Sequence, residues 1–143
     1  MAEITAICIS EQKGTKKHEV PFAELITEHG ILGDAHAGRW HRQVSMLSDE
    51  DVDTMRARGA VLSPGDFGEN LLTRGISLTS LAVLTRVQVG SAVLEITQIG
   101  KECHSECEIK RMVGTCVMPT RGVFARVITG GIIRKGDRIE VIA

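Results

Sequence analysis

Residues 81–100 read LAVLTRVQVGSAVLEITQIG, and this stretch decides the fold class. It is rich in Val and Ile, places apolar residues at roughly alternate positions, and is bounded by Gly and Ser, as is typical of half-buried strands separated by turns. The same pattern recurs in residues 122–128 and 137–143, and most cleanly in residues 4–10. We therefore predict a mainly β protein.

Two segments depart from this alternation. In residues 48–59, Ser48 can cap a helix, acidic residues crowd its first turn, and Gly59 can end it, so we predict a short helix there. Residues 104–114 form a weaker helix candidate that would stop at Gly114. Strands spread over the whole length predict one domain over residues 1–143, a closed or nearly closed β-barrel or a sandwich, with a few short helices at its rim.

Length and charge limit the function classes. The chain has 143 residues, 43% of them hydrophobic, which suffices for one domain with its own core. Its 17 basic and 18 acidic residues give a net charge of −1, so no global field would attract nucleic acid or a membrane. The start lacks the pattern of a secretion signal, and no apolar run reaches the length of a membrane span. We expect a cytoplasmic protein.

Three of the four cysteines lie in residues 100–116, GKECHSECEIKRMVGTC. In a reducing compartment such a cluster indicates metal binding or catalysis more than a disulfide framework. A zinc site of Cys103, His104, Cys107 and Cys116 is one alternative, although its spacing is poor. A transient disulfide between Cys103 and Cys107 is another, and burial of Cys107 and Cys116 as small apolar side chains is the plainest interpretation.

Cys103 has a different setting from the other cysteines. It comes directly after the predicted strand in residues 92–100, with Lys101 two residues before it and His104 after it. Nearby positive charge favours the thiolate, which attacks electrophiles, carries sulfur or ligates a soft metal. The carboxylate of Glu102 would act against this by raising the pKa of the thiol.

The segment GDAHAGRWHRQ, residues 33–43, contributes Asp34, His36, Arg39, His41 and Arg42. A metal site built from His36, His41 and Asp34 is one interpretation. Side chains of a glycine-rich loop more often satisfy backbone groups. The arginines could hold a phosphate, because the planar guanidinium forms bidentate hydrogen bonds.

The segment SPGDFGEN, residues 63–70, lacks the G-K-[ST] ending of a phosphate loop. Its Gly65 and Gly68 indicate a backbone with positive φ. Its polar residues, which include Glu69 and Asn70, either tie the turn or face a pocket. We favour the structural role, with Asn70 as a pocket candidate.

Four ordered motifs together resemble the MOSC domain, named for the C-terminus of molybdenum cofactor sulfurases. They are GILGDAHAG…RQVSML, SPGDFGENLL, LEITQIGKECH…C and CVMPTRGVFARVITGGIIRKGDRIEV, and the match runs from about Ile4 to Val141. The chain is most similar to small stand-alone members and to those linked to molybdopterin biosynthesis. Many relatives have proline before the functional cysteine, where this chain has Glu102.

The resemblance implies a β-barrel with one functional cysteine in a pocket. Cys103 matches that cysteine, and it would ligate molybdenum of a bound molybdopterin or carry sulfur as a persulfide. Arg121, or Lys101 as second choice, would neutralise the cofactor's phosphate. The predicted site consists of Cys103 and His104 as catalytic residues, with Cys103 also as the metal ligand. Its predicted cofactor-binding residues are Lys101, Arg121, Arg39, His36, Asp34 and Asn70.

Three hypotheses follow. The protein binds molybdenum cofactor and transfers sulfur, or reduces a substrate with electrons from a partner. Alternatively, it is a carrier or assembly module without turnover of its own, or a zinc-stabilised binding domain. The expected partners are cofactor-biosynthesis or sulfur-donor proteins, and the sequence leaves the oligomeric state open.

Overall fold

The computed structural model describes residues 2–13, 15–59, 61–100 and 121–142. Strands dominate it, with one α-helix and one 3-10 turn, so the prediction of a mainly β protein is confirmed. In chain order the elements are β1 (Glu3–Ile9), β2 (His18–Val20), β3 (Phe22–Ile26), β4 (Gly30–Ile31), β5 (Val44–Ser48), α1 (Asp49–Arg56), β6 (Leu71–Arg74), η1 (Leu78–Ser80), β7 (Arg86–Val89), β8 (Ala92–Ile99), β9 (Val123–Thr129), β10 (Gly131–Arg134) and β11 (Ile139–Val141).

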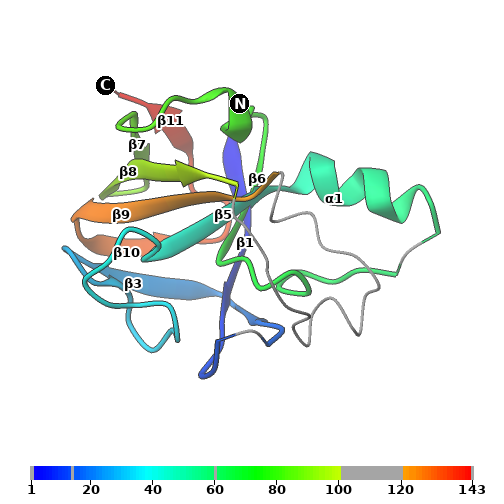
Figure 1. Ribbon diagram of the computed structural model, residues 1–143, viewed down its shortest axis with the longest axis horizontal. Helices are drawn as coiled ribbons and strands as arrows, with labels where there is room; N and C mark the ends of the chain where they lie inside the picture. Colours follow the sequence, from blue (N-terminus) through cyan, green and yellow to red (C-terminus); the bar gives the residue numbers. More distant parts are fainter. Residues whose placement is uncertain (1, 14, 60, 101–120, 143) are drawn as a thin grey trace.

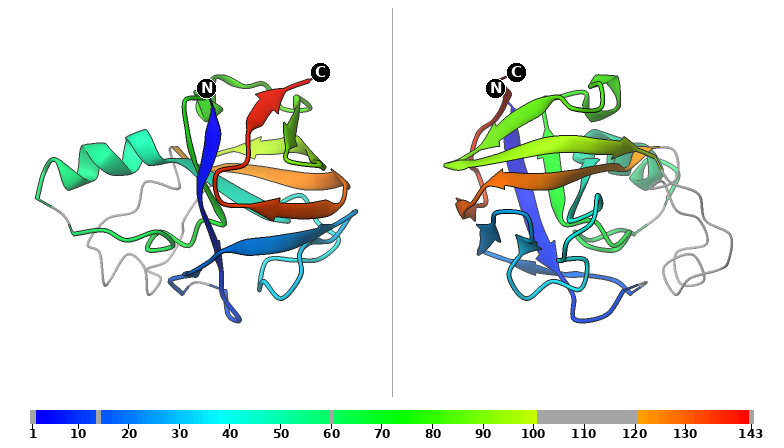
Figure 2. Two further views of the ribbon diagram at one scale, coloured as in Figure 1. Left: turned by 180° about the vertical axis from the view of Figure 1, so that it is seen from behind. Right: turned by 60° about the vertical axis from the view of Figure 1, so that its left-hand side comes forward.

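The strands form two sheets (Figure 1). The larger has the order β11-β7-β8-β9-β5-β6-β1-β2, and its neighbours are antiparallel except for the parallel pair β5 and β6. The smaller has the order β10-β3-β4. The two ends of the described chain lie on the same side of the molecule (Figure 2), and the Ile139 N–H donates to the Ala2 carbonyl oxygen at 3.2 Å.

The expected closed or nearly closed barrel is not confirmed. Among the described residues neither sheet closes, and β11 and β2 form the edges of the larger one. Near the β11 edge, β1 is reached by a single isolated bridge between Glu3 and Arg138. The physical reason is that the chain leaves the larger sheet after β9, and β10 pairs with β3 instead of continuing it.

The main hydrophobic core lies between the two sheets. It contains buried side chains from the larger sheet, such as Met46, together with Leu25 and Ile133 from the smaller one. A second cluster covers the opposite face of β5, where Leu47 packs with Val52 of α1. All five residues of β5 are therefore buried, and its sequence VSMLS shows no alternation of polar and apolar residues.

The helix predicted in residues 48–59 is confirmed as α1. Ser48 occupies the N-cap position with an extended backbone, but its side chain makes no capping hydrogen bond. The acidic first turn instead forms ion pairs, as Asp49 does with Arg56 at 3.1 Å and with Arg74 at 3.0 Å. The candidate helix in residues 104–114 lies outside the described residues. No helix in the described ranges is both long enough and apolar enough to span a membrane.

Candidate functional site

The candidate site is centred on the end of the β8–β9 hairpin, where the chain leaves the larger sheet. The Gly100 N–H donates to the Gly122 carbonyl oxygen at 2.6 Å, which closes the described base of this hairpin. Lys101, Cys103 and His104 follow Gly100 and lie outside the described residues. Their predicted roles stay predictions, and the described structure supplies the surroundings of the exit point.

The loop of residues 32–43 is attached to this end of β8. His41 Nε2 lies 2.8 Å from the Oε1 of Gln98, and the Thr97 hydroxyl donates to the His41 carbonyl oxygen. Gln98 pairs with Phe124 across the hairpin, one register position from the last pair of β8 and β9. The loop that the sequence singled out therefore lies beside the residues that lead to Cys103.

Trp40 is the centre of this loop. Its indole N–H donates to the His36 carbonyl oxygen at 2.7 Å, and the rings of Trp40 and His36 are stacked at an interplanar angle of 5°. The guanidinium carbon of Arg42 lies 5.4 Å from the Trp40 ring and 5.6 Å from the Phe124 ring. Lys13 Nζ lies 4.5 Å from the Trp40 ring. Two cations thus lie on the faces of aromatic rings, a favourable cation–π arrangement.

The cations of the loop, and Lys13 beside it, lack acidic partners within the described ranges. No ion pair joins Lys13, Arg39 or Arg42 to any carboxylate there, and Arg42 Nε is buried without a hydrogen-bond partner. Burial of an unpaired donor on a charged group costs free energy. The loop therefore carries positive charge that no carboxylate of the described residues offsets.

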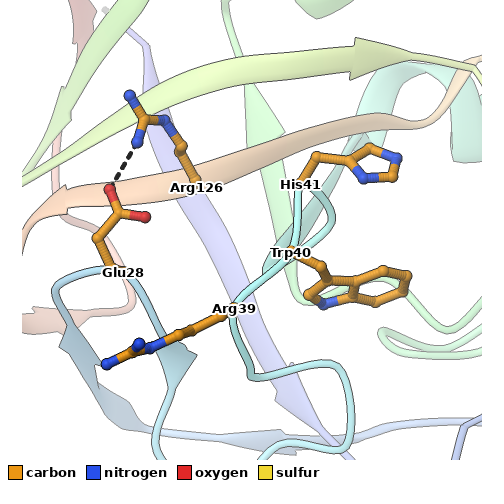
Figure 3. Close-up of a pocket in the computed structure, with 5 residues that line it drawn as sticks. All are labelled: Glu28, Arg39, Trp40, His41 and Arg126. Carbon is orange, nitrogen blue, oxygen red and sulfur yellow. Dashed lines mark hydrogen bonds and ion pairs between the residues drawn. The ribbon is translucent and has the colours of Figure 1, made fainter.

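A cavity of about 550 Å³ adjoins the loop (Figure 3). Two of its lining residues neutralise each other, because Arg126 contacts Glu28 at 2.6 Å. Trp40 and His41 project to the same side in the figure, whereas Arg39 points the other way. Its full lining is Glu28, Arg39, Trp40, His41 and Arg126.

Beneath the loop lies a buried polar network around Lys17. Lys17 Nζ contacts Asp34 Oδ1 at 2.7 Å, and both side chains are fully buried. The same ammonium contacts Ser10 Oγ and His36 Nδ1, each at 3.1 Å. Asp34 and His36 were predicted from the sequence, but Lys17 was missed, because the Lys16–Lys17 pair has the pattern of a solvated surface.

Asn70 is part of the core, not of the loop cluster. It is fully buried, and its Oδ1 accepts from the Ser45 N–H at 2.9 Å while its Nδ2 donates to the Cys8 carbonyl oxygen at 3.0 Å. This amide joins β5 to the end of β1. The geometry matches the structural role favoured for residues 63–70, and a cofactor contact by Asn70 stays a prediction.

Arg121 lies away from the loop of residues 32–43, although it directly precedes Gly122, whose carbonyl oxygen accepts from the Gly100 N–H at the exit of β8. Its Nε contacts Asp51 Oδ2 of α1 at 3.1 Å. The loop precedes β5 and α1 follows it, so the two regions lie at opposite ends of this strand (Figure 1). Arg121 borders a separate hollow of about 370 Å³ lined by Ser48, Glu50, Asp51, Gly75, Ile76, Ser77 and Arg121.

A metal site in the loop finds no support in the described part of the chain. No group of three or more His, Cys, Asp or Glu residues gathers there in a way that could hold a metal ion. The reason is that Asp34 is engaged by Lys17, and His41 by Gln98. The proposed zinc ligands Cys103, His104, Cys107 and Cys116 lie outside the described residues.

Cys8, in contrast, is a buried structural thiol. Burial raises the pKa of the Cys8 thiol well above its usual range, and the nearby carboxylate of Glu69 raises it further. The thiol is therefore protonated at neutral pH, and the thiolate is the reactive form. Among the described residues it is the one free cysteine, and it takes no part in the site.

Glu69 predicts a pH-dependent stability. Burial raises its pKa from 4.5 to about 7, although the Gly65 and Phe67 N–H groups donate to its carboxylate at 2.8 and 3.1 Å. The pKa of Glu69 is higher in the folded than in the unfolded protein. Its contribution to the free energy of unfolding is therefore fully present below pH 4.5 and is lost as the pH rises through about 7. We expect the free energy of unfolding to fall by roughly 3 kcal/mol between pH 4.5 and 8 from this group alone.

Urea denaturation of wild type and Glu69→Gln at several pH values measures this contribution. The variant cannot titrate at residue 69, so its free energy of unfolding should vary less over that range. Equal slopes in the two proteins would show that Glu69 does not titrate near neutrality.

Comparisons with known proteins give a family and a fold. The family model described as MOSC domain matches residues 33–140. The crystal structure of the YUAD protein from Bacillus subtilis superposes with a TM-score of 0.78 at 20% identity, covering 99% of this chain and 96% of that chain. No curated protein sequence matches the chain.

Two further solved structures share this fold. The crystal structure of YiiM from Geobacillus stearothermophilus has a TM-score of 0.77 at 17% identity, and the match covers 100% of this chain and 76% of that chain. For YiiM from Escherichia coli the TM-score is 0.70 at 18% identity, with 99% of this chain and 70% of that chain covered. At these identities the likeness establishes the fold alone.

Proposed function

Because the chain belongs to the MOSC domain family, we propose that it binds a molybdenum cofactor at the loop of residues 32–43 and uses Cys103 as the functional thiolate. The family is associated with functions like those of molybdenum cofactor sulfurases. The observation that carries the proposal is the guanidinium of Arg42, which has a buried unpartnered Nε and lies on the rings of Trp40 and Phe124, and Phe124 pairs with Gln98 near the end of β8.

The described residues fit such a ligand. The molybdenum cofactor consists of molybdopterin, a heterocycle that carries a phosphate, and a molybdenum ion, and when bound it would supply that metal for oxygen or sulfur chemistry. Arg42 and Lys13 offer positive charge without competing carboxylates, and Trp40 offers an aromatic face beside them. Arg39 would add a third cation at the cavity wall. Arg121, paired with Asp51, is less suited to the phosphate than Arg42.

Cys103 would supply the soft ligand or the sulfur carrier. Cys103 follows Gly100 by three positions along the chain, and such a stretch spans at most about 11 Å. As a carrier, its thiolate would attack the outer sulfur of a donor persulfide. An S–S bond then forms on Cys103, the donor's S–S bond breaks, and the donor leaves as a thiolate.

The first prediction concerns Cys103. Protein produced in a host that makes molybdopterin should contain molybdenum, or sulfane sulfur on Cys103, and Cys103→Ser should lose at least about nine-tenths of it because a hydroxyl is a poor soft-metal ligand. Metal analysis and mass spectrometry of the intact protein measure both. The matched control Cys107→Ser should load like wild type. Loss in Cys107→Ser with retention in Cys103→Ser would contradict the assignment.

A second prediction tests the role of the Arg42 guanidinium. Arg42→Gln removes the unpaired charge, and we expect its cofactor content at limiting supply to fall about tenfold or more, since charge-assisted hydrogen bonds contribute roughly 1.5–3 kcal/mol. Arg58→Gln is the matched control, because Arg58 is exposed beyond the end of α1. Equal loading of both variants would place the anion elsewhere.

The same preparations separate the alternatives. Stable loading without turnover would identify a carrier for cofactor-biosynthesis enzymes, whereas reduction of an N-hydroxylated base after addition of a reductase would identify an enzyme. About one zinc per chain, with unfolding on chelation, would instead identify a zinc-stabilised domain.

A further inference from the structure

We propose that Lys17 is a positioning residue that holds His36 in the neutral tautomer with its proton on Nε2. The feature that carries this inference is the donor and acceptor count around the Lys17 ammonium. It rests on contacts within the described chain, and only its consequence for ligand binding depends on the proposed function.

The ammonium of Lys17 has three N–H donors and no acceptor. Its side chain is fully buried, so water cannot substitute for a missing partner. It has three partners: Asp34 Oδ1 at 2.7 Å, Ser10 Oγ at 3.1 Å and His36 Nδ1 at 3.1 Å. Ser10 Oγ donates its own proton to the Gln12 carbonyl oxygen at 2.9 Å, so it accepts from Lys17.

The third donor of Lys17 therefore requires a lone pair on His36 Nδ1. The competing arrangement would place a proton on Nδ1 and direct it to Asp34 Oδ2. That distance is 3.9 Å, too long for a hydrogen bond. Asp34 Oδ2 accepts instead from the His36 backbone N–H at 3.1 Å. A proton on Nδ1 would face the ammonium, so the neutral ring carries its proton on Nε2.

The surroundings also hold the ring in place. Trp40 stacks on the imidazole, and its N–H is bonded to the His36 carbonyl oxygen. Charged groups around this pair of rings include Lys17 and Asp34 at His36, and Lys13 and Arg42 at the Trp40 ring. Of these, Lys17 and Asp34 form the buried ion pair.

The consequence for the site is specific. About a quarter of the His36 side chain is exposed, at 24%, so the imidazole is accessible from the loop surface. If the proposed function holds, an Nε2–H donor without formal charge is what His36 can offer the anionic ligand. The ligand's charge would then be balanced by Arg42 and its neighbours.

Nitrogen-15 NMR of the uniformly labelled full chain tests the tautomer directly. We expect His36 to show an unprotonated Nδ1 and a protonated Nε2 at pH 7. A protonated Nδ1, or a charged ring at pH 7, would overturn the proposal. This measurement needs neither a ligand nor a variant.

The double variant Lys17→Met with Asp34→Asn removes the buried ion pair as a unit. In this variant we expect His36 to populate both tautomers at pH 7. Lys16→Met is the matched control, because Lys16 is partly exposed and contacts Asp66 at 3.8 Å. An unchanged His36 spectrum in a folded double variant would show that Lys17 does not position the ring.

Ligand loading distinguishes this inference from the proposed function. The amide N–H of His36→Gln can replace an Nε2–H donor, whereas the shorter His36→Asn side chain mimics Nδ1. We expect His36→Asn to reduce molybdenum content about tenfold at limiting supply and His36→Gln to reduce it less. Equal loading in both would overturn the donor role. Absence of loading in wild type would refute the proposed function and leave the NMR assignment standing.

Discussion

Gly65→Ala is expected to lower the free energy of unfolding by at least about 3 kcal/mol. The residue has φ of +89°, and an ideal Cβ on it would lie 2.0 Å from the carbonyl oxygen of Lys17. Overpacking typically costs 1–3 kcal/mol, and the left-handed backbone adds roughly 1–2 kcal/mol for a residue with a Cβ. The two costs act together at this position.

The contact cannot be relieved by a side-chain rotation, because the backbone fixes the position of the Cβ and the atom that it meets is a backbone carbonyl oxygen. The Lys17 N–H donates to the Gly65 carbonyl oxygen at 2.8 Å, and the Gly65 N–H donates to Glu69 Oε2 at 2.8 Å. Relief therefore requires the segment containing Lys17 to move. Since Lys17 holds Asp34 and His36, we also expect Gly65→Ala to perturb the candidate site.

Gly33→Ala is the matched control for this variant. Gly33 has nearly the same φ, +88°, but nothing lies within 4 Å of its ideal Cβ. It should therefore show only the backbone cost of roughly 1–2 kcal/mol. Urea denaturation of the three proteins measures the difference. Equal destabilisation by the two variants would show that the contact with Lys17 is relieved at little cost.

The strands that the sequence predicted keep partly buried or exposed residues among their buried ones. The runs at residues 4–10, 81–100 and 122–128 contain β1, β7, β8 and β9. Strand β5 could not be found this way, because hydrophobic clusters cover both of its faces and all five residues are buried. Alternation is a property of half-buried strands, so a fully buried strand loses the signal.

The candidate site was predictable only where its residues share one loop. Asp34, His36 and Arg39 are close in sequence, and the structure keeps them in the same region. Arg121 was predicted from its place before a strand. Which carboxylate an arginine pairs with depends on the element that lies next to it, and here α1 supplies Asp51. Whether a lysine is buried likewise depends on contacts between distant segments, as between Lys17 and Asp34.

The effect of Lys17→Met follows from that buried pair. Both side chains are fully buried, at an Nζ–Oδ1 distance of 2.7 Å. Removal of the ammonium leaves the Asp34 carboxylate without its counter-charge, although the backbone N–H groups of Ser10 and His36 still donate to it, each at 3.1 Å. Loss of one partner of a buried pair typically costs 3–5 kcal/mol. We expect a decrease of that size in the free energy of unfolding at pH 7.

A double-mutant cycle isolates this coupling. Asp34→Asn alone leaves the ammonium buried and should be destabilising by a similar amount, whereas the double variant removes both charges and should recover most of the loss. Lys135→Met is the control, because Lys135 and Glu19 are exposed and 3.6 Å apart, and such pairs contribute little. Strict additivity of the two single variants would mean that the charges of Lys17 and Asp34 do not stabilise each other, and the arrangement that holds His36 would then need another explanation.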